Sequence, residues 1–161
     1  GDPFADFSIG WNFNLNVYNF DLSVTTYGTF GNDIFRGYER NLNYTNKPVS
    51  VLARWTGEGT SNFEPRATFI DSNNNVRPST RYVEDGSYFK IKNVQLGYNF
   101  NVSNSKNLDA VRLYLQGKNL MTFTDYTGYD PEMSYGVLDT GIDRGNYPSP
   151  RTVSVGLNVK F

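Results

Sequence analysis

Two stretches of the sequence alternate strictly between apolar and polar residues, one near each end. The apolar parity of the first stretch holds Phe7, Ile9, Trp11, Phe13, Leu15 and Val17. The apolar parity of the second holds Val153, Val155, Leu157, Val159 and Phe161. A period of two places all these side chains on one face of a β-strand, whereas a helix would scatter them. The pattern therefore predicts an all-β protein.

Weaker alternation between these stretches predicts about five antiparallel strands in total. They lie near residues 4–17, 20–30, 87–100, 110–124 and 151–161. Residues 18–20 form the tight turn of the first hairpin, and the polar segment 101–109 forms a second turn. Upstream of Val94 the parity slips, which indicates either a bulge near Lys92 or a strand that leaves the buried zone there.

The remaining connections between strands are two long segments without alternation, residues 31–86 and 125–150. Within the first, Pro48 is followed by Val51, Leu52 and Trp55 at helical spacing, and Gly57 ends the pattern. This predicts one short helix packed on a larger body. Short polar turns thus alternate with long loops rich in Tyr, Gly, Asp and Pro, an asymmetry typical of outer-membrane barrels.

Alternation also occurs in soluble β-sandwiches, so the residues at the polar positions have to distinguish a membrane barrel from a sandwich. Here it holds mainly Asn, Ser, Thr and Gly, and the apolar stripes have the roughly 9–11 residues of a tilted membrane strand. Aromatic residues gather near the predicted strand ends, as in an interfacial girdle. The mean hydropathy of -0.54 is compatible with a membrane barrel, because a barrel strand is apolar only at every second position. A soluble secreted β-sandwich that binds carbohydrate remains the alternative.

Five strands cannot close a membrane barrel, since bacterial barrels need at least about eight. An open edge in lipid would leave backbone groups unpaired at a cost of several kcal/mol each, by general estimates. The sequence is therefore expected to be one arc of a larger barrel. Because the last strand ends the chain, we expect the C-terminal arc.

Composition excludes several classes of function. The chain has no Cys and no His, which removes disulfides, thiol nucleophiles, Cys/His zinc sites and His-based triads. Its net charge of -1 provides no excess of positive charge to attract nucleic acid. Asp130 and Glu132 have the composition of a glycosidase carboxylate pair, but a turn centred on Pro131 explains them better. We therefore expect no enzyme, no metal and no cofactor.

Three blocks of the sequence resemble the C-terminal barrel segments of the SusC/RagA-like TonB-dependent transporters of Bacteroidetes. They are "RYVEDGSYFKIKNVQLGYNF" (81–100), "VRLYLQGKNLMTFTDYTGYDPE" (111–132) and "GIDRGNYPSPRTVSVGLNVKF" (141–161), preceded by "VLARWTGEG" and "EPRAT". The resemblance implies a plugged outer-membrane barrel that imports a glycan or peptide through TonB, with a SusD-like surface lipoprotein as lid. It places residues 31–86 and 125–150 outside the cell and the short turns in the periplasm.

Candidate contact residues for the substrate or the lid come from the second long loop, because Tyr rings give wide and rigid contact surfaces. They are Tyr126, Tyr129, Asp130, Tyr135 and Tyr147. The last strand, with Val153, Val155, Leu157, Val159 and terminal Phe161, resembles the signal that the barrel-assembly machinery recognises. The expected partners of the chain also include the remainder of the barrel, the plug and the lipid bilayer.

Overall fold

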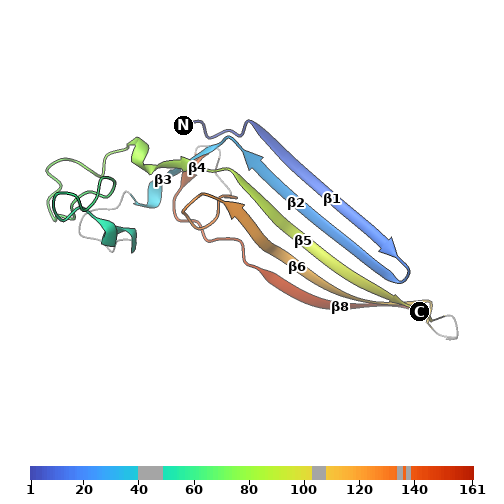
Figure 1. Ribbon diagram of the computed structural model, residues 1–161. Helices are drawn as coiled ribbons and strands as arrows, with labels where there is room; N and C mark the ends of the chain where they lie inside the picture. The colour runs from blue at the N-terminus through green and yellow to red at the C-terminus, as the bar shows by residue number, and fades with distance from the viewer. Residues whose placement is uncertain (40–48, 103–107, 134–135, 137–138) are drawn as a thin grey trace.

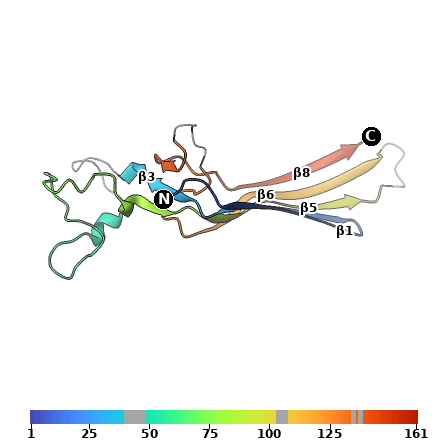
Figure 2. The same cartoon turned by 90° about the horizontal axis from the view of Figure 1, so that it is seen from above.

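Five antiparallel strands form one curved sheet in the order β1-β2-β5-β6-β8 (Figure 1). The computed structural model describes residues 1–39, 49–102, 108–133, 136 and 139–161. The strands of the sheet are β1 (Phe7–Val17), β2 (Phe20–Phe30), β5 (Tyr88–Phe100), β6 (Ala110–Thr124) and β8 (Thr152–Lys160). Seen from above, they make a single layer (Figure 2). The all-β class predicted from the alternation is confirmed.

The strands pair in a register that places apolar residues beside apolar residues, and polar residues beside polar ones, across the whole sheet. One row joins five apolar residues, namely Leu15, Leu22, Leu96, Leu115 and Val155. The next row joins five polar residues, namely Asn14, Ser23, Gln95, Gln116 and Ser154. Neighbouring rows point to opposite sides because strand side chains alternate. The sheet consequently has one apolar face and one polar face.

The apolar face is bare. Leu15 is 44% exposed, Leu115 49% and Val155 72%. The charged residues of the five strands, Asp21, Lys90, Lys92, Arg112, Lys118 and Lys160, all lie on the opposite, polar face. A soluble sandwich would need a second sheet against the apolar face, and the described residues provide none.

A bulge at Lys92 explains the slip of parity in β5. On one side, Thr25 pairs with Asn93 and Thr26 with Ile91, so Lys92 has no partner in β2. On the other side the register shifts at the same place, between Ile91 and Asn93. The structure thus shows the bulge rather than a strand leaving the buried zone.

Short connections lie at one end of the sheet and long ones at the other (Figure 1). β1 and β2 are joined by the two residues Tyr18 and Asn19, with Tyr18 at a φ of 52°. The β5–β6 connection lies at the same end, and its residues 103–107 are outside the described part.

A second, three-stranded sheet joins the two long loops at the other end. Its strands are β3 (Asp33–Arg36), β4 (Val83–Asp85) and β7 (Ile142–Asp143), in the order β4-β3-β7. β3 runs antiparallel to β4 and parallel to β7. The loops are therefore joined by backbone hydrogen bonds, although more than 100 residues of sequence separate β3 from β7.

The short helix expected in the first loop is the five-residue 3-10 helix η2 (Val49–Ala53). Pro48 lies outside the described residues, and Trp55 lies beyond the end of the helix. Val49 is 80% exposed and Leu52 76%, so η2 does not pack on the described chain as expected. Two further 3-10 helices, η1 (Gly37–Glu39) and η3 (Thr80–Tyr82), flank β3 and β4. Among the described residues, no helix has the length and apolar character to cross a membrane.

Candidate functional site

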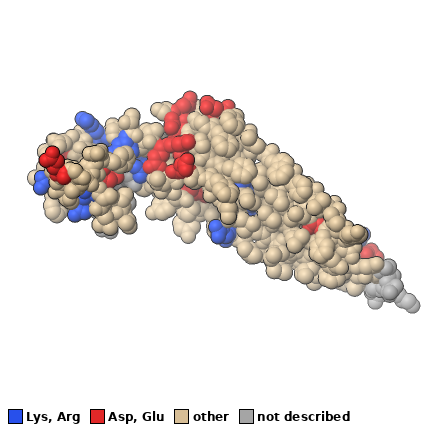
Figure 3. Space-filling view, viewed as in Figure 1, with Lys and Arg blue, Asp and Glu red and all other residues tan. Residues whose placement is uncertain are grey.

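Buried side chains gather at the loop end of the sheet, where the two long loops fold against each other. The buried hydrophobic residues of the described chain are Ile34, Tyr82, Tyr88 and Tyr126. The buried polar residues are Thr26, Arg36, Lys90, Asp130 and Asp143. Charged side chains are also concentrated over this end (Figure 3). Burial of charge requires compensating partners, so the contacts of these residues define the site.

Asp143 connects two parts of the second loop through hydrogen bonds. Its Oδ2 accepts a hydrogen bond of 2.6 Å from the Tyr126 hydroxyl, and its Oδ1 accepts one of 2.7 Å from the Gly145 N–H. Burial and the Asp143 carboxylate raise the pKa of Tyr126, so its hydroxyl stays a neutral donor.

Glu84 of β4 connects the first loop to the second. Its Oε1 lies 2.9 Å from the Arg36 Nε, and its Oε2 accepts a hydrogen bond of 2.9 Å from the Thr127 N–H. Arg36 is 6% exposed, so this ion pair is largely shielded from water. Together with the β3–β7 pairing, these contacts make one folded unit of the two loops.

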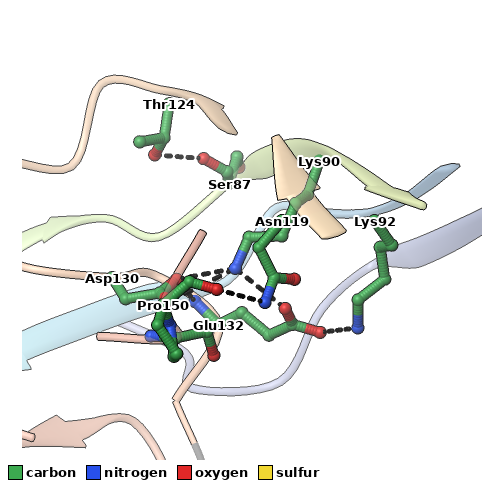
Figure 4. A network of polar contacts seen from close by, with 9 residues as sticks. Ser87, Lys90, Lys92, Asn119, Thr124, Asp130, Glu132 and Pro150 are labelled. Atoms are coloured by element: carbon green, nitrogen blue, oxygen red, sulfur yellow. Dashed lines mark hydrogen bonds and ion pairs between the residues drawn. The ribbon is translucent and has the colours of Figure 1, made fainter. Parts of the chain in front are cut away.

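Lys90 of β5 is the centre of a second cluster (Figure 4). Its Nζ lies 3.0 and 3.2 Å from the two carboxylate oxygens of Asp130 and 2.9 Å from Oε2 of Glu132. Glu132 also pairs with Lys92 through its other oxygen. Asp130 additionally accepts hydrogen bonds from the Glu132 N–H at 3.0 Å and the Ser149 N–H at 3.1 Å.

The neighbouring lysines favour the charged form of Glu132. Burial disfavours the Glu132 carboxylate, but hydrogen bonds from Lys92 and Lys90 outweigh it and hold the pKa of Glu132 below its ordinary value of 4.5. Two lysines face two carboxylates, so the cluster is balanced in charge. Both carboxylates bind lysines of β5, so the cluster connects the second loop to the sheet.

A cleft of about 440 Å³ opens beside the Lys90 cluster. The second loop contributes Tyr129, Pro148 and Ser149 to its walls, and β6 contributes Asn119 and Thr122. A smaller neighbouring cleft of about 240 Å³ is lined by Glu132, Asn146 and Tyr147, among others. An aromatic ring among amides and hydroxyls suits a polar ligand such as a sugar or a peptide. Among the described residues, no group of three or more acidic side chains is arranged to hold a metal ion.

The five predicted contact residues of the second loop have different environments. Tyr126 is 5% exposed and Asp130 9%, and both side chains bond within the chain. Tyr129 is 67% exposed and Tyr147 92%, so these rings are open to a partner. Tyr135 lies outside the described residues. Contact of any of them with a substrate or lid stays a prediction.

Sequence reasoning missed Lys90, Arg36, Glu84 and Asp143. Two features of the sequence could have indicated Lys90. It lies with Lys92 at a strand end rich in aromatic residues, and the two carboxylates of "GYDPE" have no cationic residue close to them in sequence, so they need a partner from elsewhere in the chain. The predicted assembly-signal residues Val153, Val155, Leu157 and Val159 lie on the apolar face of β8, and Phe161 follows the strand at 84% exposure. Their role in assembly stays a prediction.

An exposed apolar face on one side and a polar face on the other are the two surfaces of a membrane barrel wall, where lipid covers the apolar face and the barrel interior lies behind the polar one. The chain thus forms part of the wall of a transmembrane β-barrel, with two long loops at one mouth.

Comparison with known proteins narrows this class to a family. The chain is 37% identical to TonB-dependent receptor P3 and 37% identical to TonB-dependent receptor P26, both of Formosa agariphila. Each match covers 100% of this chain and 17% of the relative. No family model matches. The chain belongs to the TonB-dependent receptors, as part of their barrel in the bacterial outer membrane, which confirms the family indicated by the sequence blocks.

Solved structures agree on the fold. The RagAB peptide importer in its "closed-closed" state matches 99% of this chain and 18% of its own chain, with a TM-score of 0.77 and 21% identity. The same importer in its "open-open" state matches 96% of this chain and 17% of its own, with a TM-score of 0.74 and 21% identity. The named relatives are receptors and importers rather than enzymes. This chain spans about a sixth of the length of the proteins that it matches.

Proposed function

We propose that the full-length protein imports a large nutrient, a glycan or a peptide, across the outer membrane with energy delivered through TonB. This chain is then the C-terminal arc of the barrel, and the plug and TonB-binding segment belong to the rest of the protein. The observation that supports this most is the similarity to TonB-dependent receptors over 100% of the chain. The cleft beside Tyr129 adds a polar, aromatic surface at the barrel mouth, suited to either nutrient class.

The partner that we propose is a SusD-like surface lipoprotein, which closes the mouth as a lid. The first long loop offers it an apolar surface, since Phe63 is 60% exposed, Phe69 87% and Ile70 81%. Exposed aromatic and aliphatic side chains of this kind are enriched in the centres of protein interfaces. The orientation follows from the same proposal: the long loops lie outside the cell, and the Tyr18–Asn19 turn faces the periplasm.

Uptake by the native organism tests the import function. Cells that lack the full-length gene, and cells complemented with it, would be given fluorescein-labelled oligosaccharides and oligopeptides. We expect complemented cells alone to accumulate at least one probe, and dissipation of the proton-motive force to abolish the accumulation. Equal accumulation with and without the gene, or accumulation that survives loss of the proton-motive force, would contradict the proposal.

A further inference from the structure

Lys90 is buried in a sheet that is only one layer thick. Its exposed fraction is 2%, whereas Lys118, on the same polar face in β6, is exposed. A single layer cannot bury a lysine by itself, so another segment has to cover it. That segment is the second long loop, which folds back across the polar face at the loop end of the sheet (Figure 4).

Asp130 fastens both limbs of this loop to the same point. Asp130 lies in the outgoing limb, where the Glu132 N–H closes a local turn on it, and the returning limb binds it through the Ser149 N–H, 19 residues away in sequence. Lys90 then joins the carboxylate to the wall. A hydrogen bond of 3.1 Å from the Asn119 side-chain amide to the Pro150 carbonyl adds a second attachment of the returning limb to β6. The base of the loop is thus closed on itself and fixed to the sheet.

Charge balance makes this attachment sensitive to single changes. Lys90 and Lys92 neutralise Asp130 and Glu132, and the Lys90–Asp130 pair has side chains only 2% and 11% exposed. Removing one member of a buried ion pair leaves the other charge without a partner and destabilises far more than the pair itself contributes. The loop should therefore detach when Lys90 loses its charge.

We propose that Lys90, Asp130 and Glu132 form a latch that docks the second loop on the inner wall of the barrel and so positions Tyr129 at the mouth as a contact for cargo. Tyr129 precedes Asp130 directly, and both line the same cleft. The residues of the latch are positioning residues, since they act on cargo through Tyr129. Only the cargo contact rests on the import function proposed above; the docking of the loop does not.

Hydrogen exchange in the full-length receptor, purified in detergent, tests the docking. In Lys90→Met we expect the Ser149 amide to exchange at least about tenfold faster, because Asp130, its acceptor, is no longer held in place by Lys90. Lys118→Met is the matched control and should leave the Ser149 rate unchanged, and Lys90→Arg should keep the protection. If the Ser149 amide stays as protected in Lys90→Met as in the native receptor, the latch does not exist.

Uptake of the fluorescein-labelled probes tests the positioning. Tyr129→Ala and Lys90→Met should each lower uptake, and the double variant should be no worse than Lys90→Met alone, because a detached loop no longer presents Tyr129. Fully additive losses, or faster exchange with unchanged uptake, would overturn the positioning role. If the native receptor imports none of the probes, the import proposal fails, while the exchange experiment still decides whether the loop is latched.

Discussion

Asn119 shows how a single residue fits the irregularity in the sheet. It lies in β6 opposite the Lys92 bulge and has a φ of 51°, in the left-handed region. Asn tolerates this conformation better than other residues with a Cβ, because its short amide bonds locally. Its amide also donates to the Pro150 carbonyl. Backbone conformation and attachment of the loop thus depend on one side chain.

Two substitutions at this position separate the two roles. Asn119→Ala and Asn119→Gly both lose the hydrogen bond to Pro150, but only Ala meets the steric cost of the left-handed region, about 1–2 kcal/mol. We expect the Ala variant of the full-length receptor to unfold at a lower temperature than the Gly variant in a band-shift assay on SDS gels. Equal stability of the two variants would show that the backbone conformation at Asn119 carries no strain for Ala.

At the scale of the element, the docking of the second loop should depend on pH through Glu132. Lys90 and Lys92 from β5 and Asp130 from the loop surround this carboxylate. Because the pKa of Glu132 is lowered in the docked loop, the stabilisation is fully present above its ordinary pKa of 4.5. It is lost as the pH falls through the lowered value.

A nitroxide label on Tyr129→Cys would report this change, and the chain has no cysteine that competes for the label. We expect the label to become more mobile as the pH falls below about 4.5 and through the lowered pKa, because protonation of the Glu132 carboxylate breaks its ion pairs. Glu132→Gln serves as the control, since it should raise the mobility at neutral pH and reduce its further change on acidification. A label as immobile in Glu132→Gln as in the native sequence at neutral pH would exclude Glu132 from the docking of the loop.

For the whole molecule, the two faces of the sheet should respond differently to charge. Val155 and Ser154 are neighbours in β8 that point to the lipid side and the inner side. Val155→Arg should destabilise the full-length receptor by about 2–4 kcal/mol if this row lies near the bilayer centre, whereas Ser154→Arg should cost much less. The amount of SDS-resistant, folded protein in outer-membrane fractions measures the difference. Equal loss in both variants would contradict the assignment of the faces.

Orientation in the membrane has a direct test at the two ends of the sheet. Ser72 lies in the first long loop, and Asn19 lies in the short turn at the opposite end. A cysteine at Ser72 should react with a membrane-impermeant reagent on intact cells, while one at Asn19 should react only after the cells are opened. Labelling at Asn19 alone on intact cells would reverse the proposed topology.

Much of the wall could be predicted because its pattern is local. Alternation in Phe7–Val17 and Thr152–Lys160 requires no knowledge of distant residues, and the slip near Lys92 was visible as a change of parity. The loops could not be predicted in this way. Their sheet depends on pairing of Phe35 with Ile142, and such contacts between remote segments leave no periodic signal.

The sequence by itself determined that the chain forms strands with one apolar and one polar face, because a period of two specifies the face of every residue in a strand. It also indicated the family through its ordered blocks. Only the tertiary structure decided that Tyr126 and Asp130 turn inward while Tyr129 and Tyr147 remain exposed. The reason is that Lys90 and Asp130 meet across 40 residues, and such a contact exists only once the strands are in register and the loop has folded back over them.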